Sequence, residues 1–175
     1  MRQLSFLILL GLLALSASCD SAGKEPAGTN IDSGLTTFFL VRHAEKATDG
    51  TSDPSLTKEG EIRAQRLAEL LKVNGVEAIY STPFQRTKQT AEPLASNLNL
   101  PIQEYDHKAE NLAETLIQTN QGKTVLVVGH SNSTPTLINN LIGEEKFQEL
   151  DESVYNKLFI VTIGNGAAKA LVLEY

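Results

Sequence analysis

The sequence is poor in the residues that would mark a disulfide-stabilised or nucleic-acid-binding protein. Its 175 residues include a single cysteine, so no disulfide can form within the chain and its stability must come from packing. Lysine and arginine number 15 against 21 acidic residues, which gives a net charge of −6. That balance argues against a nucleic-acid partner, because such proteins need a basic face. Arginine is scarce enough for its positions to be informative: Arg2, Arg42, Arg63, Arg66 and Arg86.

The apolar run near the N-terminus is too short to cross a membrane. It covers residues 4–15, whereas a membrane-spanning helix needs roughly 20 residues. Arg2 precedes the run, and the small residues Ser16, Ala17 and Ser18 follow it. A basic residue, an apolar segment and small residues in this order are typical of a secretory signal, and we predict that residues 1–18 are a signal peptide.

Cys19 follows the small residues directly. This arrangement resembles a bacterial lipoprotein signal, in which the cysteine is lipidated and becomes the first residue of the mature chain. Lipidated cysteines of this kind carry several acyl chains, and stable anchoring requires more than one. Ser16 departs from the pattern, which more often has leucine there. The alternative is ordinary cleavage that leaves a free thiol, but the position of the cysteine favours lipidation.

Residues 19–35 are rich in Ser, Gly, Ala, Thr and Asp and lack periodic apolar positions. They are predicted to form a flexible tether between the lipid and a folded domain. The N-terminal features together predict a protein that is exported to the bacterial cell envelope and held there by lipid, on the periplasmic side or the outer surface.

Residues 36–175 are predicted to form one domain, and the chain's 41% hydrophobic content is enough for a full core. Continuous apolar runs predict strands buried on both faces, and amphipathic stretches between them predict helices. The expected strands are 36–41, 76–80, 100–105, 123–128, 158–163 and 168–173, and the expected helices are 57–74, 83–97, 110–119 and 132–142. This alternation predicts an α/β fold, a three-layer α/β/α sandwich around a mainly parallel sheet with an antiparallel C-terminal hairpin.

Chemically useful side chains fall at the ends of these elements. Arg42 and His43 follow the first strand, His130 follows the strand 123–128, and Arg86 lies in the first turns of the helix after Ser81. Ligands of such sheets bind beyond the carboxyl ends of the strands, so these residues are expected to converge. A lone histidine after a strand is usually structural, but two histidines with two arginines indicate an anion pocket.

The physical chemistry of this set suits phosphoryl transfer. Guanidinium groups bind phosphoryl oxygens in a fixed bidentate geometry, and amides at the start of the helix after His130 can add donors. A neutral imidazole such as that of His43 can attack phosphorus near neutral pH. The second imidazole, if protonated, can stabilise charge on the phosphoryl oxygens.

Four segments in order resemble the histidine phosphatase superfamily, which also contains the cofactor-dependent phosphoglycerate mutases. They read Phe-Leu-Val-Arg-His-Ala-Glu-Lys at 39–46, Asp-Pro-Ser-Leu-Thr-Lys-Glu-Gly at 53–60, Ser-Thr-Pro-Phe-Gln-Arg-Thr-Lys-Gln-Thr-Ala at 81–91 and Val-Val-Gly-His-Ser-Asn at 127–132. The chain is similar to small bacterial members, including the short phosphohistidine phosphatases.

The resemblance implies a phosphoglycerate mutase-like fold and assigns roles to the converging residues. His43 would be the phosphorylated nucleophile, and Arg42, Arg86 and His130 would complete the phosphate pocket. It implies neither a metal nor a cofactor. Ala44 stands where the archetype of the superfamily has glycine. Many small bacterial members also have alanine there, so this residue does not identify the subfamily but is compatible with the chemistry.

The proton donor is less clearly indicated. Active members of the superfamily use an acidic residue from the segment after the Arg86 helix, and the candidates here are Glu104 and Asp106, neither in a recognisable motif. The short phosphohistidine phosphatases manage without a clear acid, since a phosphoramidate asks less of one. Other charged side chains are expected at the surface: His107, Arg63 and Arg66 solvated, and Glu45 with Lys46 as a pocket rim or an exposed ion pair.

The expected activity is hydrolysis of a phosphomonoester or phosphoramidate through a phosphohistidine on His43. A zinc site on His43 and His130 is the rival chemistry, and it is disfavoured because two arginines would repel a cation. The other rival is a catalytically weak or silent fold that binds phosphorylated glycans or lipids. Phosphoglycerate mutase activity is not expected, because the domain is short and exported. A phosphorylated small molecule and a phosphoprotein remain open as substrates, as does the oligomeric state.

Overall fold

The computed structural model describes residues 34–175. The predicted signal peptide, Cys19 and nearly all of the predicted tether therefore lie outside the described residues. No helix of the described chain is long and apolar enough to cross a membrane.

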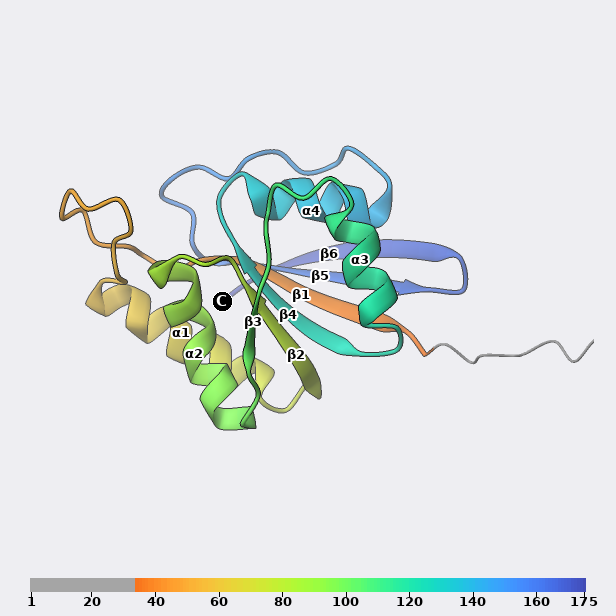
Figure 1. Ribbon diagram of the computed structural model, residues 1–175, viewed down its shortest axis with the longest axis horizontal. Coiled ribbons are helices and arrows are strands. Elements are labelled where there is room, and N and C mark those ends of the chain that lie inside the picture. The colour runs from red at the N-terminus through yellow and green to blue at the C-terminus, as the bar shows by residue number, and fades with distance from the viewer. Residues whose placement is uncertain (1–33) are drawn as a thin grey trace, which may run out of the picture. The chain divides into compact units, whose positions relative to one another are not determined.

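Six strands form one sheet in the order β3-β2-β4-β1-β5-β6 (Figure 1). Strands β1 to β4 run parallel to one another, while β5 pairs antiparallel with both β1 and β6. The elements are β1 Thr36–Arg42, α1 Lys58–Leu71, β2 Val76–Ser81, α2 Gln85–Leu98, β3 Ile102–Glu104, α3 Leu112–Thr119, β4 Thr124–Gly129, α4 Ser133–Ile142, β5 Lys157–Gly164 and β6 Ala167–Glu174. The predicted α/β fold and its antiparallel C-terminal hairpin are confirmed.

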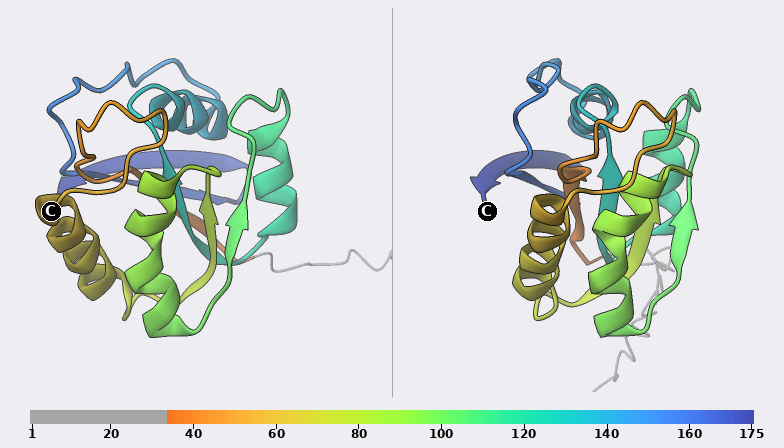
Figure 2. Two further views of the ribbon diagram at one scale, coloured as in Figure 1. Left: turned by 60° about the vertical axis from the view of Figure 1, so that its left-hand side comes forward. Right: turned by 90° about the vertical axis from the view of Figure 1, so that its left-hand side faces the viewer.

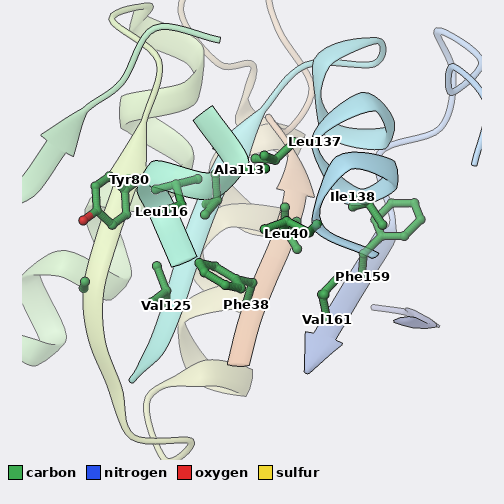
Figure 3. Close-up of a cluster of buried hydrophobic side chains, with 13 residues drawn as sticks. Phe38, Leu40, Tyr80, Ala113, Leu116, Val125, Leu137, Ile138, Phe159 and Val161 are labelled. Carbon is green, nitrogen blue, oxygen red and sulfur yellow. The ribbon is translucent and has the colours of Figure 1, made fainter. Parts of the chain in front are cut away.

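The helices cover the sheet in two layers, with α1 and α2 on one face and α3 and α4 on the other (Figure 2). Alternate side chains of β1 are buried on opposite faces of the sheet, because successive side chains of a strand point in opposite directions. Phe38 and Leu40 pack toward α3 and α4 (Figure 3), and Phe39 and Val41 pack toward α1 and α2. This explains the unbroken apolar run in the sequence, since burial of each such side chain contributes roughly 2 kcal/mol.

The buried side of α1 is narrow. Leu67 and Leu71 are buried, but Ile62 and Leu70 are 46% and 44% exposed. At about 100° per residue, Leu70 falls just outside the buried stripe of the helix, and Ile62 falls on the nearly opposite side, which faces away from the sheet's core.

The second helix begins later than predicted, at Gln85 instead of near Pro83, and neither Ser81 nor Thr82 caps it. The cap comes from the loop after β1, because the carboxylate of Asp53 accepts the Gln85 backbone N–H at 2.9 Å. Ser81 and Thr82 are buried and bond elsewhere, with Thr82 contacting the ring of His130. This long-range cap fixes the start of α2, and with it the position of Arg86.

Candidate active site

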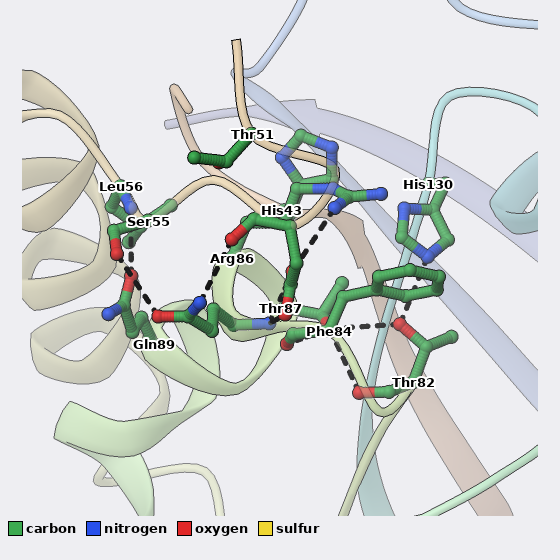
Figure 4. Close-up of polar contacts among 12 residues, drawn as sticks. His43, Thr51, Ser55, Leu56, Thr82, Phe84, Arg86, Thr87, Gln89 and His130 are labelled. Atoms are coloured by element: carbon green, nitrogen blue, oxygen red, sulfur yellow. Dashed lines mark hydrogen bonds and ion pairs between the residues drawn. The ribbon is translucent and has the colours of Figure 1, made fainter. Parts of the chain in front are cut away.

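Strand pairing brings the two histidines of the predicted site together. Arg42, the last residue of β1, lies opposite Gly129 of β4, and Gly129 accepts the His43 backbone N–H at 2.9 Å. His43 and His130 therefore follow neighbouring parallel strands at one edge of the sheet. Their ring centroids are 5.5 Å apart in an edge-to-face arrangement, and Figure 4 shows the side chain of Arg86 beside the His43 ring.

The surroundings of His43 leave one ring nitrogen free to react. Nδ1 lies 2.7 Å from the carbonyl oxygen of Ala44, and because a carbonyl only accepts, Nδ1 must carry the hydrogen. The lone pair is then on Nε2. Burial, opposed by this hydrogen bond and aided by Arg42 and Arg86, lowers the pKa of His43 to about 4. The imidazole is therefore uncharged at neutral pH, which is the form that can act as a nucleophile.

His130 is also kept neutral by its environment. Burial, followed by the charge of Arg86 and the nearby His43, lowers its pKa to about 3. Its Nε2 lies 3.0 Å from the hydroxyl oxygen of Thr82 (Figure 4). His130 can therefore carry the positive charge expected of it only when an anion lies nearby, because the anion favours the protonated form.

Arg42 is almost completely buried, at 2% exposure, and it anchors the segment between α4 and β5. Its Nη1 donates to the carbonyl oxygens of Asp151, Glu152 and Val154 at 2.9, 3.1 and 3.1 Å. Its Nη2 lies 3.0 Å from the Glu152 carboxylate, which also accepts the hydroxyl of Ser131. The Nε–H of Arg42 is buried and has no hydrogen-bond partner among residues 34–175, so this donor is not already used by the protein.

Arg86 reaches the same space from the start of α2. Its Nη1 is 3.5 Å from Asp53, and the guanidinium packs 4.4 Å above the ring centroid of Phe84. Its Nε–H is likewise buried and unpartnered among the described residues. Both arginines thus offer a free N–H, and a buried donor of this kind costs about 1–3 kcal/mol unless something accepts it.

The four predicted residues line one hollow of about 350 Å³. Lys46, Ser131 and Asn132 also line it, the last two just before the start of α4. The Ser133 N–H, however, is taken by the side chain of Asn132. Within residues 34–175, no three His, Cys, Asp or Glu side chains are grouped closely enough to hold a metal ion.

Two surface predictions were wrong. Arg63 is not solvated: its guanidinium makes a bidentate contact with Glu45 at 2.6–3.0 Å and donates to the backbone oxygen of Tyr175. Glu45 is thereby turned away from Lys46, which lines the hollow without it. Gly60 permits this packing, because a Cβ there would lie 2.3 Å from the Glu45 carbonyl oxygen.

His107 is the second wrong prediction. Instead of standing free at the surface, its ring lies edge-on to His130 with the centroids 5.5 Å apart, and it lines the hollow. The two carboxylates proposed as proton donors lie outside this hollow. Glu104 pairs with Lys88 at 2.5 Å, and Asp106 accepts the backbone N–H of Lys108. Periodicity could not find His107, because its position depends on how the loop after β3 folds back.

The fold and the paired histidines and arginines define an α/β protein built to bind an anionic group at the carboxyl edge of its sheet. Residues 38–107 match the model of the histidine phosphatase superfamily, branch 1. The chain belongs to the histidine phosphatase superfamily.

Curated relatives match part of their length. A probable phosphoglycerate mutase, GpmB, of Salmonella paratyphi A is 30% identical over 131 residues, which span 69% of this chain and 60% of the mutase. Phosphoserine phosphatase 1 of Hydrogenobacter thermophilus is 34% identical over 82 residues, spanning 43% of this chain and 39% of the phosphatase. The chain therefore spans less than two thirds of each.

Solved structures share the fold at lower identity. The protein histidine phosphatase SixA, complexed with tungstate, superposes with a TM-score of 0.62 at 22% identity, covering 79% of this chain and 96% of that one. Phosphoserine phosphatase of Entamoeba histolytica, in complex with 3-phosphoglyceric acid, gives a TM-score of 0.63 at 19% identity, with coverage of 80% and 97%. The likeness confirms the phosphoglycerate mutase-like architecture.

The lowered pKa values can be read directly by NMR. Because burial and cationic neighbours disfavour the imidazolium, His43 and His130 should keep the chemical shifts of neutral rings at least down to about pH 5. The measurement is a pH titration of the ring carbons in the full chain, with signals assigned from single His→Gln variants. A midpoint near the ordinary value of about 6.5 for either residue would contradict the description.

The carboxylate of Glu152 would compete with an anionic ligand for the same hydrogen-bond donors. Its carboxylate contacts both Arg42 and Ser131, so Glu152→Gln should tighten the binding of inorganic phosphate by about fivefold, the equivalent of roughly 1 kcal/mol. Isothermal calorimetry at fixed ionic strength checks this. Glu149→Gln removes the same charge from the rim without touching Arg42 and should have a smaller effect; equal effects would mean that only the net charge matters.

Proposed function

We propose that the protein is a phosphatase that hydrolyses a phosphomonoester or phosphoramidate through a phosphohistidine on His43. The observation that carries the proposal is the orientation of the His43 ring. The bond from Nδ1 to Ala44 leaves the lone pair of the ring on Nε2, and the Nε–H groups of Arg42 and Arg86 have no partner in the part of the chain that the structure describes.

The arrangement supports a two-step reaction. The Nε–H groups of Arg42 and Arg86 hold the phosphoryl oxygens, and His130 donates a further hydrogen bond once the anion has raised its pKa. His43 Nε2 forms a bond to phosphorus as the bond to the leaving group breaks and the leaving group takes up a proton. Water then attacks phosphorus, the P–N bond breaks, and inorganic phosphate leaves. No step calls on a metal ion.

Relatives of known activity support a substrate of this class. The similar proteins include phosphoserine phosphatases and a protein histidine phosphatase, so a phosphorylated small molecule and a phosphoprotein are both compatible with the site. A silent binding fold is less well supported, since binding alone would not require a histidine whose reactive nitrogen is left free and neutral.

His43→Ala should lower the hydrolysis of an aryl phosphate by roughly 10³-fold or more and abolish phosphoenzyme formation, because the nucleophile is lost. The measurement is release of the phenol in buffer with and without EDTA, together with trapping of acid-labile, base-stable phosphate on the protein. Lys72→Ala, an exposed change at the end of α1, is the control and should behave as the unmodified chain does. Loss of activity in EDTA, or retained phosphorylation of the variant, contradicts the mechanism.

We further propose that residues 1–18 are removed and that Cys19 is lipidated, which anchors the domain in the bacterial cell envelope. The described chain enters β1 at Thr36, at the end of that strand opposite to His43. Seven strand residues span roughly 23 Å, so an anchor attached before β1 is connected to the edge of the sheet away from the hollow.

Cys19→Ala should move the protein from the membrane fraction to the soluble fraction when it is expressed in a bacterium that processes lipoproteins. The reason is that the acyl chains supply the membrane affinity. Ser21→Ala is the matched control and should stay with the membrane. Unchanged fractionation of the Cys19 variant would show that the cysteine is not the anchor.

A further inference from the structure

All three histidines of the chain lie around one space, but the proposed reaction uses only two of them. His130 is central, with the rings of His43 and His107 each at a centroid distance of 5.5 Å. Phe84 covers His130 from another side at 5.2 Å. His107 thus contacts His130 and lines the same hollow as His43, and neither phosphate binding nor attack accounts for it.

His107 also lies where two hollows adjoin. The hollow of His43 measures about 350 Å³ and a neighbouring one about 390 Å³. Phe84, His107 and Lys108 line both. In an in-line displacement the leaving atom lies on the side of phosphorus opposite to the attacking atom. A substrate with its phosphoryl group at His43 and its leaving group in the second hollow therefore passes His107.

The carboxylates nearby are poorly placed or poorly suited to supply a proton. Glu104 is paired with Lys88, and Asp106 accepts the backbone N–H of Lys108. Both line the second hollow and not the one that contains His43. Glu152 does line the first hollow. However, the hydroxyl of Ser131 and the charge of Arg42 hold its pKa below the ordinary value despite partial desolvation, so it is ionised and has no proton to give.

We propose that His107 is the proton donor to the leaving group. As the bond from His43 Nε2 to phosphorus forms and the bond from phosphorus to the leaving oxygen breaks, the ring N–H of His107 passes its proton to that oxygen. The neutral ring then accepts a proton from the attacking water, the P–N bond breaks, and the imidazolium of His107 is restored. An imidazole suits both halves because it exchanges protons near neutral pH. The assignment rests on the proposed phosphatase function.

The test compares two substrates that differ in their need for an acid. An alkyl monophosphate leaves as an alkoxide that must be protonated, whereas 4-nitrophenyl phosphate leaves as a stable phenolate. In the full-length protein, His107→Gln should lower kcat/KM for the alkyl substrate by about 10²–10³-fold, a typical contribution of general acid catalysis, and for the aryl substrate by less than about threefold. His107→Asn should show the same selectivity, and the far-ultraviolet spectrum of each variant checks its fold.

Matched variants separate His107 from its neighbours. Glu104→Gln, Asp106→Asn and Glu149→Gln should keep the alkyl-to-aryl rate ratio of the unmodified chain. A selective loss in one of these, an equal loss on both substrates in the His107 variants, or no loss at all overturns the assignment.

Phosphoenzyme trapping distinguishes this failure from failure of the proposed function. If the unmodified chain forms phosphohistidine on His43 from the aryl substrate, the rate ratios decide the role of His107 alone. If it forms none, the proposed function itself fails and the assignment of His107 falls with it.

Discussion

The parallel pairing of β1 with β4 is the interaction on which the rest of the site depends. Its register sets Arg42 opposite Gly129, so the residues that follow the two strands, His43 and His130, emerge side by side. The register is itself fixed by burial on both faces, because a shift of one residue would exchange the side chains of the two cores. Core packing and the juxtaposition of the two histidines are therefore specified by the same residues.

Local electrostatics around the hollow run against the charge of the whole chain. The protein is acidic, at −6, but Arg42, Arg86 and Lys46 face one small volume. The fold tolerates this concentration because Arg42 is held by three backbone carbonyls and Glu152, and Arg86 by Asp53. Burial, together with the charges of Arg42 and Arg86, keeps the imidazoles of His43 and His130 uncharged at neutral pH.

The sequence was sufficient to predict the elements and the convergence of Arg42, His43, Arg86 and His130 on one hollow. Strand runs and helix periodicity are local, and the carboxyl edge of a parallel sheet is a general binding place. It was insufficient wherever a contact joins distant loops. The start of α2 depends on a cap from Asp53, the burial of Arg63 depends on Glu45, and the place of His107 depends on the path of a loop. None of these three contacts produces a hydrophobic pattern in the sequence from which it could be predicted.

The carbonyl contacts of Arg42 have a thermodynamic consequence. The guanidinium that helps to form the hollow also orders residues 151–154, which precede β5. An anion binds more strongly when this guanidinium is correctly placed. By thermodynamic reciprocity, the bound anion must then stabilise the ordered form of residues 151–154 by the same free energy. Occupancy of the hollow is thereby linked to the local unfolding of the strand connection, and resistance of residues 143–156 to proteolysis becomes a measure of ligand binding.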